Sequence, residues 1–215
     1  MILVVASTNA HKIAEISVIA GAFGYETLSR ADAGVPDFEV EEDGATFEEN
    51  SLLKARAIYD WFGGTRAVVA DDSGLSVDFL DGAPGVYSAR FAGVDGPDAD
   101  RANNEKLLGL LSDVPAESRA ARFVSVITML TPERAAPIVC RGEVRGRVAF
   151  ASDGENGFGY DPLFVPDASE VALLPSPAVR EALAGLTFGR FPPEEKNRIS
   201  HRFRALEKLR EELRR

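Results

Sequence analysis

The sequence predicts an α/β protein that folds as one domain over residues 1–215. Two observations indicate this class: a buried-strand pattern near the N-terminus is followed by apolar residues at helical spacing, and strand and helix patterns then alternate along the chain. With 45% hydrophobic and 27% charged residues, the chain can form one sizeable core, or two lobes that share one sheet. No internal repeat or low-complexity linker divides it.

The N-terminal segment predicts a strand, a turn and a helix. MILVVAS at 1–7 is typical of a buried strand, and the helix that follows the turn should stop at Gly24. A second helix should begin at a capping box formed by Thr46 and Glu49 and end at the pair 63–64, where two glycines follow each other.

The middle of the chain predicts two short strands separated by polar residues. RAVVAD at 66–71 should be a strand that runs into DDSG, and LSVDF at 75–79 should be a separate strand. A loop rich in glycine and proline follows at 81–93.

The second half predicts a surface helix at 99–114 and then two adjacent antiparallel strands at 122–130 and 137–150. A loop and a segment with a helical fragment lead to a C-terminal helix. Its apolar face should carry Phe203, Leu206, Leu209 and Leu213.

Composition excludes several classes of protein. A net charge of -10 with a pI near 4.8 disfavours sequence-independent binding to nucleic acid. The single Cys140 cannot form an internal disulfide, and no basic leader segment precedes the first strand, so we expect a cytoplasmic protein. The longest apolar runs are far shorter than the roughly 20 residues of a membrane helix, so we expect no membrane association.

The turn Ser7–Lys12 is a candidate anion site. A strand that leads into a helix exposes free backbone N–H groups, and STNAHK adds hydroxyls, an amide and a lysine. The alternative is that Ser7, Thr8 or Asn9 only caps the helix. The chain has no GxxxxGK[ST] motif, which argues against a P-loop nucleotide hydrolase.

Asp71 and Asp72 form a candidate metal site. Two adjacent carboxylates at the carboxyl end of a strand repel each other unless a cation offsets them, and Mg²⁺ prefers carboxylate and water oxygens. The alternative is an Asx turn that ends the strand.

Three further segments could contribute to a site. Asn50 and Lys54 share a helix face that follows an acidic loop containing Glu42. Phe158 stands between glycines and could stack on a flat ligand, while Lys196 lies in a short helix. The alternatives are a solvated charged surface and a packed aromatic loop.

Five blocks in order, STNAHKIAE, EEDGATFEENSLLKA, ADDSGLSVDFLDGAPGVYSARFAG, GFGYDPLF and EEKNRISHR, resemble the inosine/xanthosine triphosphate pyrophosphatases, which are house-cleaning purine nucleotide hydrolases. The resemblance implies an elongated two-lobed subunit around a mixed, twisted sheet, with helices on its faces and an active-site cleft between the lobes. It also implies a homodimer and hydrolysis of ITP, dITP and XTP to the monophosphate and pyrophosphate, with one Mg²⁺ per subunit.

The resemblance assigns roles to individual residues. It implies that Asp72 is the catalytic base and that Glu42 and Asp72 bind the metal. The interpretation of Asp71 and Asp72 as a pair, given above, adds Asp71 to the residues around the metal. The implied substrate-binding residues are Ser7, Thr8, Asn9, Ala10, His11, Lys12, Lys54, Ser73, Phe158, Gly159, Tyr160, Asp161, Lys196, His201 and Arg202.

The chain departs from the family pattern in two places. Thr8 and His11 stand where glycine is common, so the first turn lacks that backbone freedom. The segment around 168–190 is longer than usual and is expected to be a surface insertion. Two rival functions stay open: a pyrophosphatase for modified pyrimidine triphosphates, and a nucleotide sensor without catalysis.

Overall fold

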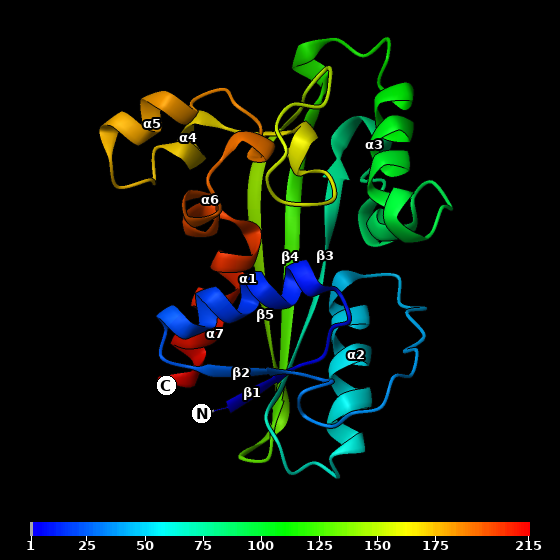
Figure 1. Cartoon of the computed structure of the whole chain (residues 1–215), viewed down its shortest axis with the longest axis vertical. Helices are drawn as coiled ribbons and strands as arrows, with labels where there is room; N and C mark the ends of the chain where they lie inside the picture. Colours follow the sequence, from blue (N-terminus) through cyan, green and yellow to red (C-terminus); the bar gives the residue numbers. More distant parts are fainter. Residues whose placement is uncertain (1) are drawn as a thin grey trace. The chain divides into compact units, whose positions relative to one another are not determined.

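The computed structural model describes residues 2–215 and contains a mixed sheet with helices around it (Figure 1). Its strand order is β2-β1-β3-β4-β5-β6. The strands are β1 (Ile2–Val5), β2 (Glu26–Ser29), β3 (Val68–Val77), β4 (Ala120–Thr131), β5 (Arg134–Val148) and β6 (Phe164–Pro166). The α-helices are α1 (Ala10–Ala22), α2 (Phe47–Trp61), α3 (Ala99–Leu110), α4 (Ala168–Val171), α5 (Pro177–Leu183), α6 (Pro193–Ile199) and α7 (His201–Leu213). The predicted α/β class is therefore confirmed.

The sheet mixes strand directions. β1 pairs in parallel with β2, with Ile2 opposite Glu26, and in parallel with β3, with Val4 opposite Val68. β6 pairs with β5 in the antiparallel direction. β4 and β5 are neighbours in the sheet, as the two β-rich sequence runs predict.

The described residues divide into two compact units. The first comprises the chain up to Asp72, Ser125–Gly142 and Arg202–Arg215, and the second comprises Ser73–Val124 and Glu143–His201.

The first unit has two apolar clusters on opposite faces of its strands. The α1/α7 cluster joins strand residues to Ile16 and Ile19 of α1 and to Ala205, Leu206 and Leu209 of α7. The α2 cluster joins other strand residues to Ala55 and Ile58 of α2. Phe203 and Leu213 pack against the α1/α7 cluster, so the predicted apolar face of the C-terminal helix is confirmed.

The second unit has a core rich in aromatic side chains. Phe123, Phe164, Phe188 and Phe191 are buried there, with Leu107 of α3 beside them. The predicted helical fragment near 171–191 is present as α5, and the predicted helix at 99–114 is present as α3.

The helix boundaries follow the predicted signals. Thr46 accepts a hydrogen bond from the backbone of Glu49, whose side chain bonds back to the cap, so the capping box of α2 is confirmed. Gly24 follows α1 with a φ of 86°. Within residues 2–215, none of the helices combines the length and apolar character needed to cross a bilayer.

The prediction of two separate strands around DDSG is wrong, because β3 runs without a break from Val68 to Val77. Gly74 serves close packing rather than a turn. A Cβ at Gly74 would lie 2.3 Å from Ser88 Oγ, and that hydroxyl accepts a hydrogen bond from Leu75 N at 2.9 Å. The Asp pair therefore lies inside a strand and not at its carboxyl end.

Candidate functional site

Asp71 and Asp72 lie on opposite faces of β3. Val69 belongs to the α1/α7 cluster, whereas Val68 and Ala70 belong to the α2 cluster. Since successive side chains of a strand alternate between faces, Asp71 shares the face of Val69 and Asp72 shares the face of Ala70. The two carboxylates consequently have separate sets of partners.

Asp71 is buried and balanced by two cations. Ser125 Oγ donates to its Oδ1 at 2.5 Å, while Lys12 Nζ and Arg202 Nη2 each lie 3.2 Å from its Oδ2. Burial would raise the pKa of Asp71, but Arg202, Lys12 and the Ser125 hydrogen bond together hold this pKa well below its ordinary value. Asp71 is therefore a fixed anion that organises cations from α1 and α7.

Arg202 lies between two carboxylates. Its Nη2 contacts Asp71, its Nη1 pairs with Glu15 of α1, and only 1% of its side chain is exposed. Burial would lower the pKa of Arg202, but Asp71 and Glu15 raise it above the usual value. The sequence-based role of Arg202 at the base stays a prediction, and its contacts here join α1, β3 and α7.

Asp72 forms the second charge cluster with Lys54 and Glu42. Lys54 Nζ lies 2.6 Å from Asp72 Oδ1 and 3.1 Å from Glu42 Oε2. Burial raises the pKa of Asp72 despite the opposing effect of Lys54. Burial would also lower the pKa of Lys54, but the carboxylates of Asp72 and Glu42 raise it. Within residues 2–215, Asp72 Oδ2 has no hydrogen-bond partner although it is buried.

The loop that carries Glu42 is fastened to the start of α2. Gly44 N donates to Asn50 Oδ1 at 2.9 Å, and Asn50 Nδ2 donates to Gly44 O at 3.3 Å. A Cβ at Gly44 would lie 2.6 Å from Asn50 Oδ1, so this close approach requires glycine. Ala45 N also donates to the side chain of Glu49, the third residue of α2 and the partner of Thr46 in the capping box. The helix that presents Lys54 therefore also places Glu42.

The donor set fits a magnesium ion held partly by substrate. Mg²⁺ keeps several waters and is usually bound by one or two carboxylates together with substrate phosphates. Glu42 and Asp72 supply two such carboxylates, and the Oδ2 of Asp72 is a buried acceptor with no protein donor in the described residues. Those residues contain no cluster of three His, Cys, Asp or Glu side chains spaced for a metal. Both oxygens of Asp71 have protein donors, so its predicted ligand role stays a prediction.

The turn before α1 is capped as the alternative interpretation proposes. Asn9 is the N-cap and accepts from Lys12 N at 3.0 Å, and Ser7 Oγ accepts from Asn9 N at 3.2 Å. Thr8 and His11 are exposed, and neither adopts the left-handed backbone that glycine would favour. The turn therefore forms without glycine, and the exposed start of α1 keeps the N–H groups that suit an anion.

Lys12 links this turn to Asp71. Burial lowers the pKa of Lys12, and the nearby charge of Asp71 opposes that effect. Its backbone N–H donates to the Asn9 cap of the turn, while its side-chain ammonium reaches Asp71 on β3.

In the second unit, Asp161 holds the aromatic loop. Its Oδ2 accepts from Lys196 Nζ at 2.6 Å and from Phe158 N at 2.9 Å, and Lys196 Nζ lies 5.0 Å from the centre of the Phe158 ring. A Cβ at Gly157 would meet the Asp161 carboxylate at 2.0 Å. The structure therefore brings together three predicted residues from two distant sequence blocks.

The remaining predicted residues occupy defined places in the second unit. His201 is buried and stacks on Phe123, with ring centres 4.8 Å apart and an interplanar angle of 13°. Tyr160 is also buried, and its hydroxyl donates to Ser88 O at 2.9 Å. Ser73 is half-buried on β3.

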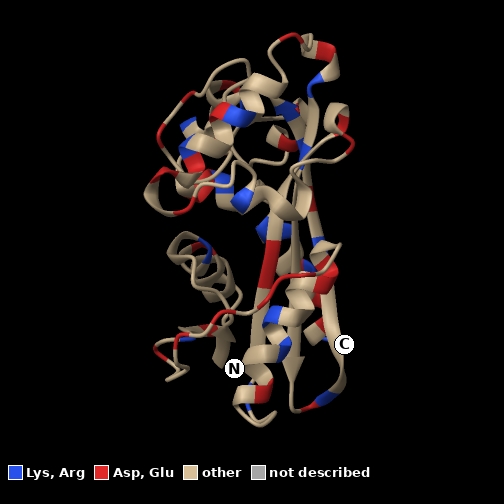
Figure 2. Cartoon of the chain, turned by 90° about the vertical axis from the view of Figure 1, so that its right-hand side faces the viewer, with Lys and Arg blue, Asp and Glu red and all other residues tan. Residues whose placement is uncertain are grey.

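Sequence reasoning missed three residues that organise the charge clusters and the loops. Glu15 pairs with Arg202, Ser125 donates to Asp71, and Ser88 holds the loop after β3. Two signals were available: Glu15 lies three residues after Lys12 on one helix face, and Ser125 is a polar residue within an apolar strand. Figure 2 shows acidic and basic residues interspersed over the chain, so the distribution of charge does not single out the ion pair of Glu15 and Arg202.

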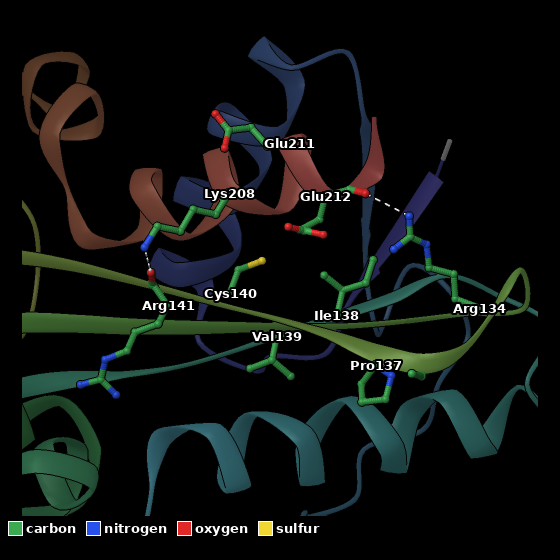
Figure 3. A pocket seen from close by; sticks show the side chains of 10 residues that line it. Arg134, Pro137, Ile138, Val139, Cys140, Arg141, Lys208, Glu211 and Glu212 are labelled. Carbon is green, nitrogen blue, oxygen red and sulfur yellow. Dashed lines mark hydrogen bonds between the residues drawn. The ribbon is translucent and has the colours of Figure 1, made fainter. Parts of the chain in front are cut away.

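A separate cavity of about 550 Å³ lies in the first unit between β5 and α7 (Figure 3). It is lined by Arg134, Ala136, Pro137, Ile138, Val139, Cys140, Arg141, Lys208, Glu211 and Glu212. None of the predicted site residues lines it. Burial raises the pKa of the Cys140 thiol to about 11, so the thiol stays protonated near neutral pH.

Comparison with known proteins agrees with the resemblance drawn from the sequence blocks. The chain matches the Ham1 family over residues 3–212. A dITP/XTP pyrophosphatase from Clostridium perfringens is 45% identical over 98% of this chain and 96% of its own length, and one from Mannheimia succiniciproducens is 44% identical over 98% and 97%. The solved structure of the Staphylococcus aureus Ham1 protein has 39% identity and a TM-score of 0.78, and the match covers 100% of this chain and 98% of that one. The chain therefore belongs to the Ham1 family.

Proposed function

We propose that the protein hydrolyses abnormal purine nucleoside triphosphates, namely dITP, ITP and XTP, to the monophosphate and pyrophosphate. The observation that carries this proposal is the separation of two adjacent carboxylates, with Asp71 neutralised by Lys12 and Arg202 and Asp72 left with an open oxygen beside Lys54. The relatives named dITP/XTP pyrophosphatase support the same reaction.

We propose that Glu42 and Asp72 hold one Mg²⁺ in each subunit during the reaction. When bound, the ion would neutralise phosphate charge and lower the pKa of coordinated water.

Asp72 is the proposed general base. Its raised pKa brings it nearer to the range in which a carboxylate accepts a proton from water at neutral pH. Lys54 contacts the same carboxylate and can change partner to a phosphate oxygen when substrate arrives. Attack by the activated water on the α-phosphorus would release pyrophosphate.

Lys12 and the start of α1 are the proposed site for the departing pyrophosphate. The Lys12 ammonium and the positive end of the α1 dipole offer positive charge to phosphate oxygens. Asp71 holds the Lys12 ammonium in place. The proposed role of Asp71 is therefore to position this cation and not to exchange protons.

Selectivity for the base is assigned to the second unit. Phe158 offers a stacking surface, which adds affinity for any base. His201 and nearby donors would satisfy the 6-oxo group of hypoxanthine or xanthine. The adenine amino group would leave such a donor unpaired, at a cost of about 1–3 kcal/mol.

A product assay tests the proposal. Protein and Mg²⁺ are incubated with ITP, dITP, XTP, ATP and GTP, and pyrophosphate is separated from orthophosphate. Pyrophosphate as the first product from the inosine and xanthosine substrates is expected. Orthophosphate as the first product contradicts attack at the α-phosphorus, and binding without turnover indicates a sensor.

The same assay extended to modified pyrimidine triphosphates tests the other rival function. Faster cleavage of those compounds than of ITP would replace the assignment to purine substrates.

The homodimer implied by the sequence blocks is a separate proposal. Sedimentation equilibrium tests it, and a monomer mass over the whole concentration range would contradict it.

A further inference from the structure

The peptide groups on both sides of Phe158 are hydrogen-bonded to acidic side chains. Phe158 N donates to Asp161 Oδ2 at 2.9 Å, and the next amide, Gly159 N, donates to Asp100 Oδ2 at 2.7 Å. Because these two amides flank the Cα of Phe158, their bonds restrict both backbone dihedrals of that residue. The direction of the Cα–Cβ bond, from which the ring extends, follows from this restraint.

Helix α3 provides a second bond to the same loop. Asn104 Nδ2 donates to Gly159 O at 3.0 Å, so both polar backbone groups of Gly159 are held by α3. Asp100 and Asn104 are four residues apart and therefore share one face of the helix. A helix is a rigid support, and the loop takes its position from two consecutive turns of it.

The same helix also holds the loop that follows β3. Asn103 Oδ1 accepts from Ala92 N at 2.7 Å, and Asn103 Nδ2 donates to Ala89 O at 3.1 Å. Helix α3 thus fastens two loops of the second unit through side chains to backbone groups. Such bonds do not depend on the side chains of the loops, and they fix the position of the backbone itself.

We propose that Asp100 and Asn104 are positioning residues that set the stacking surface of Phe158 for the purine base. This inference rests on the proposed function, because it assigns the base to the Phe158 loop. Neither residue would touch the phosphates or the reacting atoms. Their removal should weaken recognition of the base and leave the chemical step intact.

The main experiment compares Asp100→Ala and Asn104→Leu with the unaltered protein. Asn104→Leu keeps the side-chain shape and removes the donor. Loss of one such hydrogen bond is expected to raise KM for dITP about 3- to 10-fold, with kcat changed by less than about twofold. Inhibition by inorganic pyrophosphate, which has no base, should keep its inhibition constant in both variants.

Conservative and neighbouring substitutions separate positioning from general stability. Asp100→Asn retains an acceptor for Gly159 N, so KM should return to within about twofold of the original value. Arg101→Ala lies on the same helix and removes only exposed ion pairs with Asp98 and Glu105, so KM should not change. Asp100 is exposed, so its variants test the idea even where Asn104→Leu unfolds at the assay temperature.

The outcomes are distinct. Unchanged KM for dITP in Asp100→Ala overturns the inference while the proposed function stands, because the unaltered protein still cleaves dITP. An equal loss for pyrophosphate inhibition and dITP also overturns it, since the effect would then reach the phosphate site. Failure of the unaltered protein to cleave dITP contradicts the proposed function itself.

Discussion

The charge clusters of the first unit and the aromatic loop of the second unit are held in different ways. Asp71 and Asp72 are fixed by side-chain cations, Lys12 and Lys54 among them. The Phe158 loop is fixed by bonds from side chains to its backbone. The ion pairs position charged side chains that could act on phosphate. The hydrogen bonds to the backbone position the Phe158 ring, which is uncharged.

This difference predicts different consequences of mutation. Changes in the charge clusters should affect kcat or stability, because they alter buried charge. Changes around the aromatic loop should affect KM and base preference.

Removal of Mg²⁺ should have the largest effect. A chelator is expected to lower turnover of dITP by about 10³-fold or more, because the phosphate charge and the attacking water would lose the ion. Pyrophosphate release is measured before and after addition of excess Mg²⁺. Undiminished cleavage in the chelator would remove the metal from the proposal.

Asp72→Asn should lower kcat for dITP by about 10²- to 10⁴-fold, which corresponds to about 2.7–5.4 kcal/mol in the barrier. The substitution keeps the shape of the side chain and removes the proton acceptor. Asp78→Asn is the matched control, since Asp78 is exposed and only pairs with Arg122. Near-full turnover of Asp72→Asn would exclude it as the base.

Asp71→Asn should mainly reduce stability, by about 3–5 kcal/mol, because it leaves the buried Arg202 and the Lys12 ammonium without their shared anion. Denaturant unfolding with the Asp78→Asn control measures the change. A loss below about 1 kcal/mol would show that Asp71 is not the organising anion.

The same variant should change the acid limb of the stability curve. The folded pKa of Asp71 lies well below its unfolded value of about 3.9. Its stabilising contribution is therefore full above that value and is lost as pH falls through the folded pKa. Asp71→Asn should show a shallower loss of stability in acid than the unaltered protein.

Phe158→Ala should raise KM for dITP by about 5- to 150-fold, which corresponds to the roughly 1–3 kcal/mol of base stacking. The kcat value should change little, in contrast to Asp72→Asn. Initial rates measured over a range of dITP concentrations up to saturation separate the two constants. A fall in kcat with no change in KM would place Phe158 with the charge clusters instead.

Thr46→Ala should have the smallest effect, a loss of about 1 kcal/mol in unfolding free energy, because it removes the cap of α2. Since α2 presents Lys54, a drop in kcat beyond a few-fold would show that the cap also controls the charge cluster. Thr65→Ala removes the hydroxyl that donates to Phe62 O at the other end of α2, so it shows whether loss of a hydrogen bond at that end has the same effect.

The sequence predicted the features that depend on local residues. The capping box at Thr46, the stop at Gly24 and the apolar face of α7 follow from spacing and were confirmed. Lys12, Lys54, Asp72 and Glu42 were selected from the sequence, and in the structure Lys54 contacts Asp72 and Glu42 while Lys12 contacts Asp71.

The sequence did not predict that β3 continues through DDSG. Asp, Ser and Gly favour turns locally, but Lys12 and Lys54 offset the charges from other elements and Ser88 packs against Gly74. These partners lie between 14 residues (Gly74 and Ser88) and 59 residues (Asp71 and Lys12) apart in the chain, and no local pattern encodes them. The spacing of Glu15 from Lys12 was a local signal, but it does not reveal the partner Arg202, which lies 187 positions further along the chain.

The Asp71 cluster has a consequence for synthesis of the chain. Its partners come from α1, β4 and α7, so the carboxylate emerges from the ribosome long before Arg202 does. Until Arg202 is translated, a nascent polypeptide would have to bury this carboxylate without its guanidinium or keep the segment open. Truncation before α7 should therefore yield a chain that chaperones retain and proteases degrade.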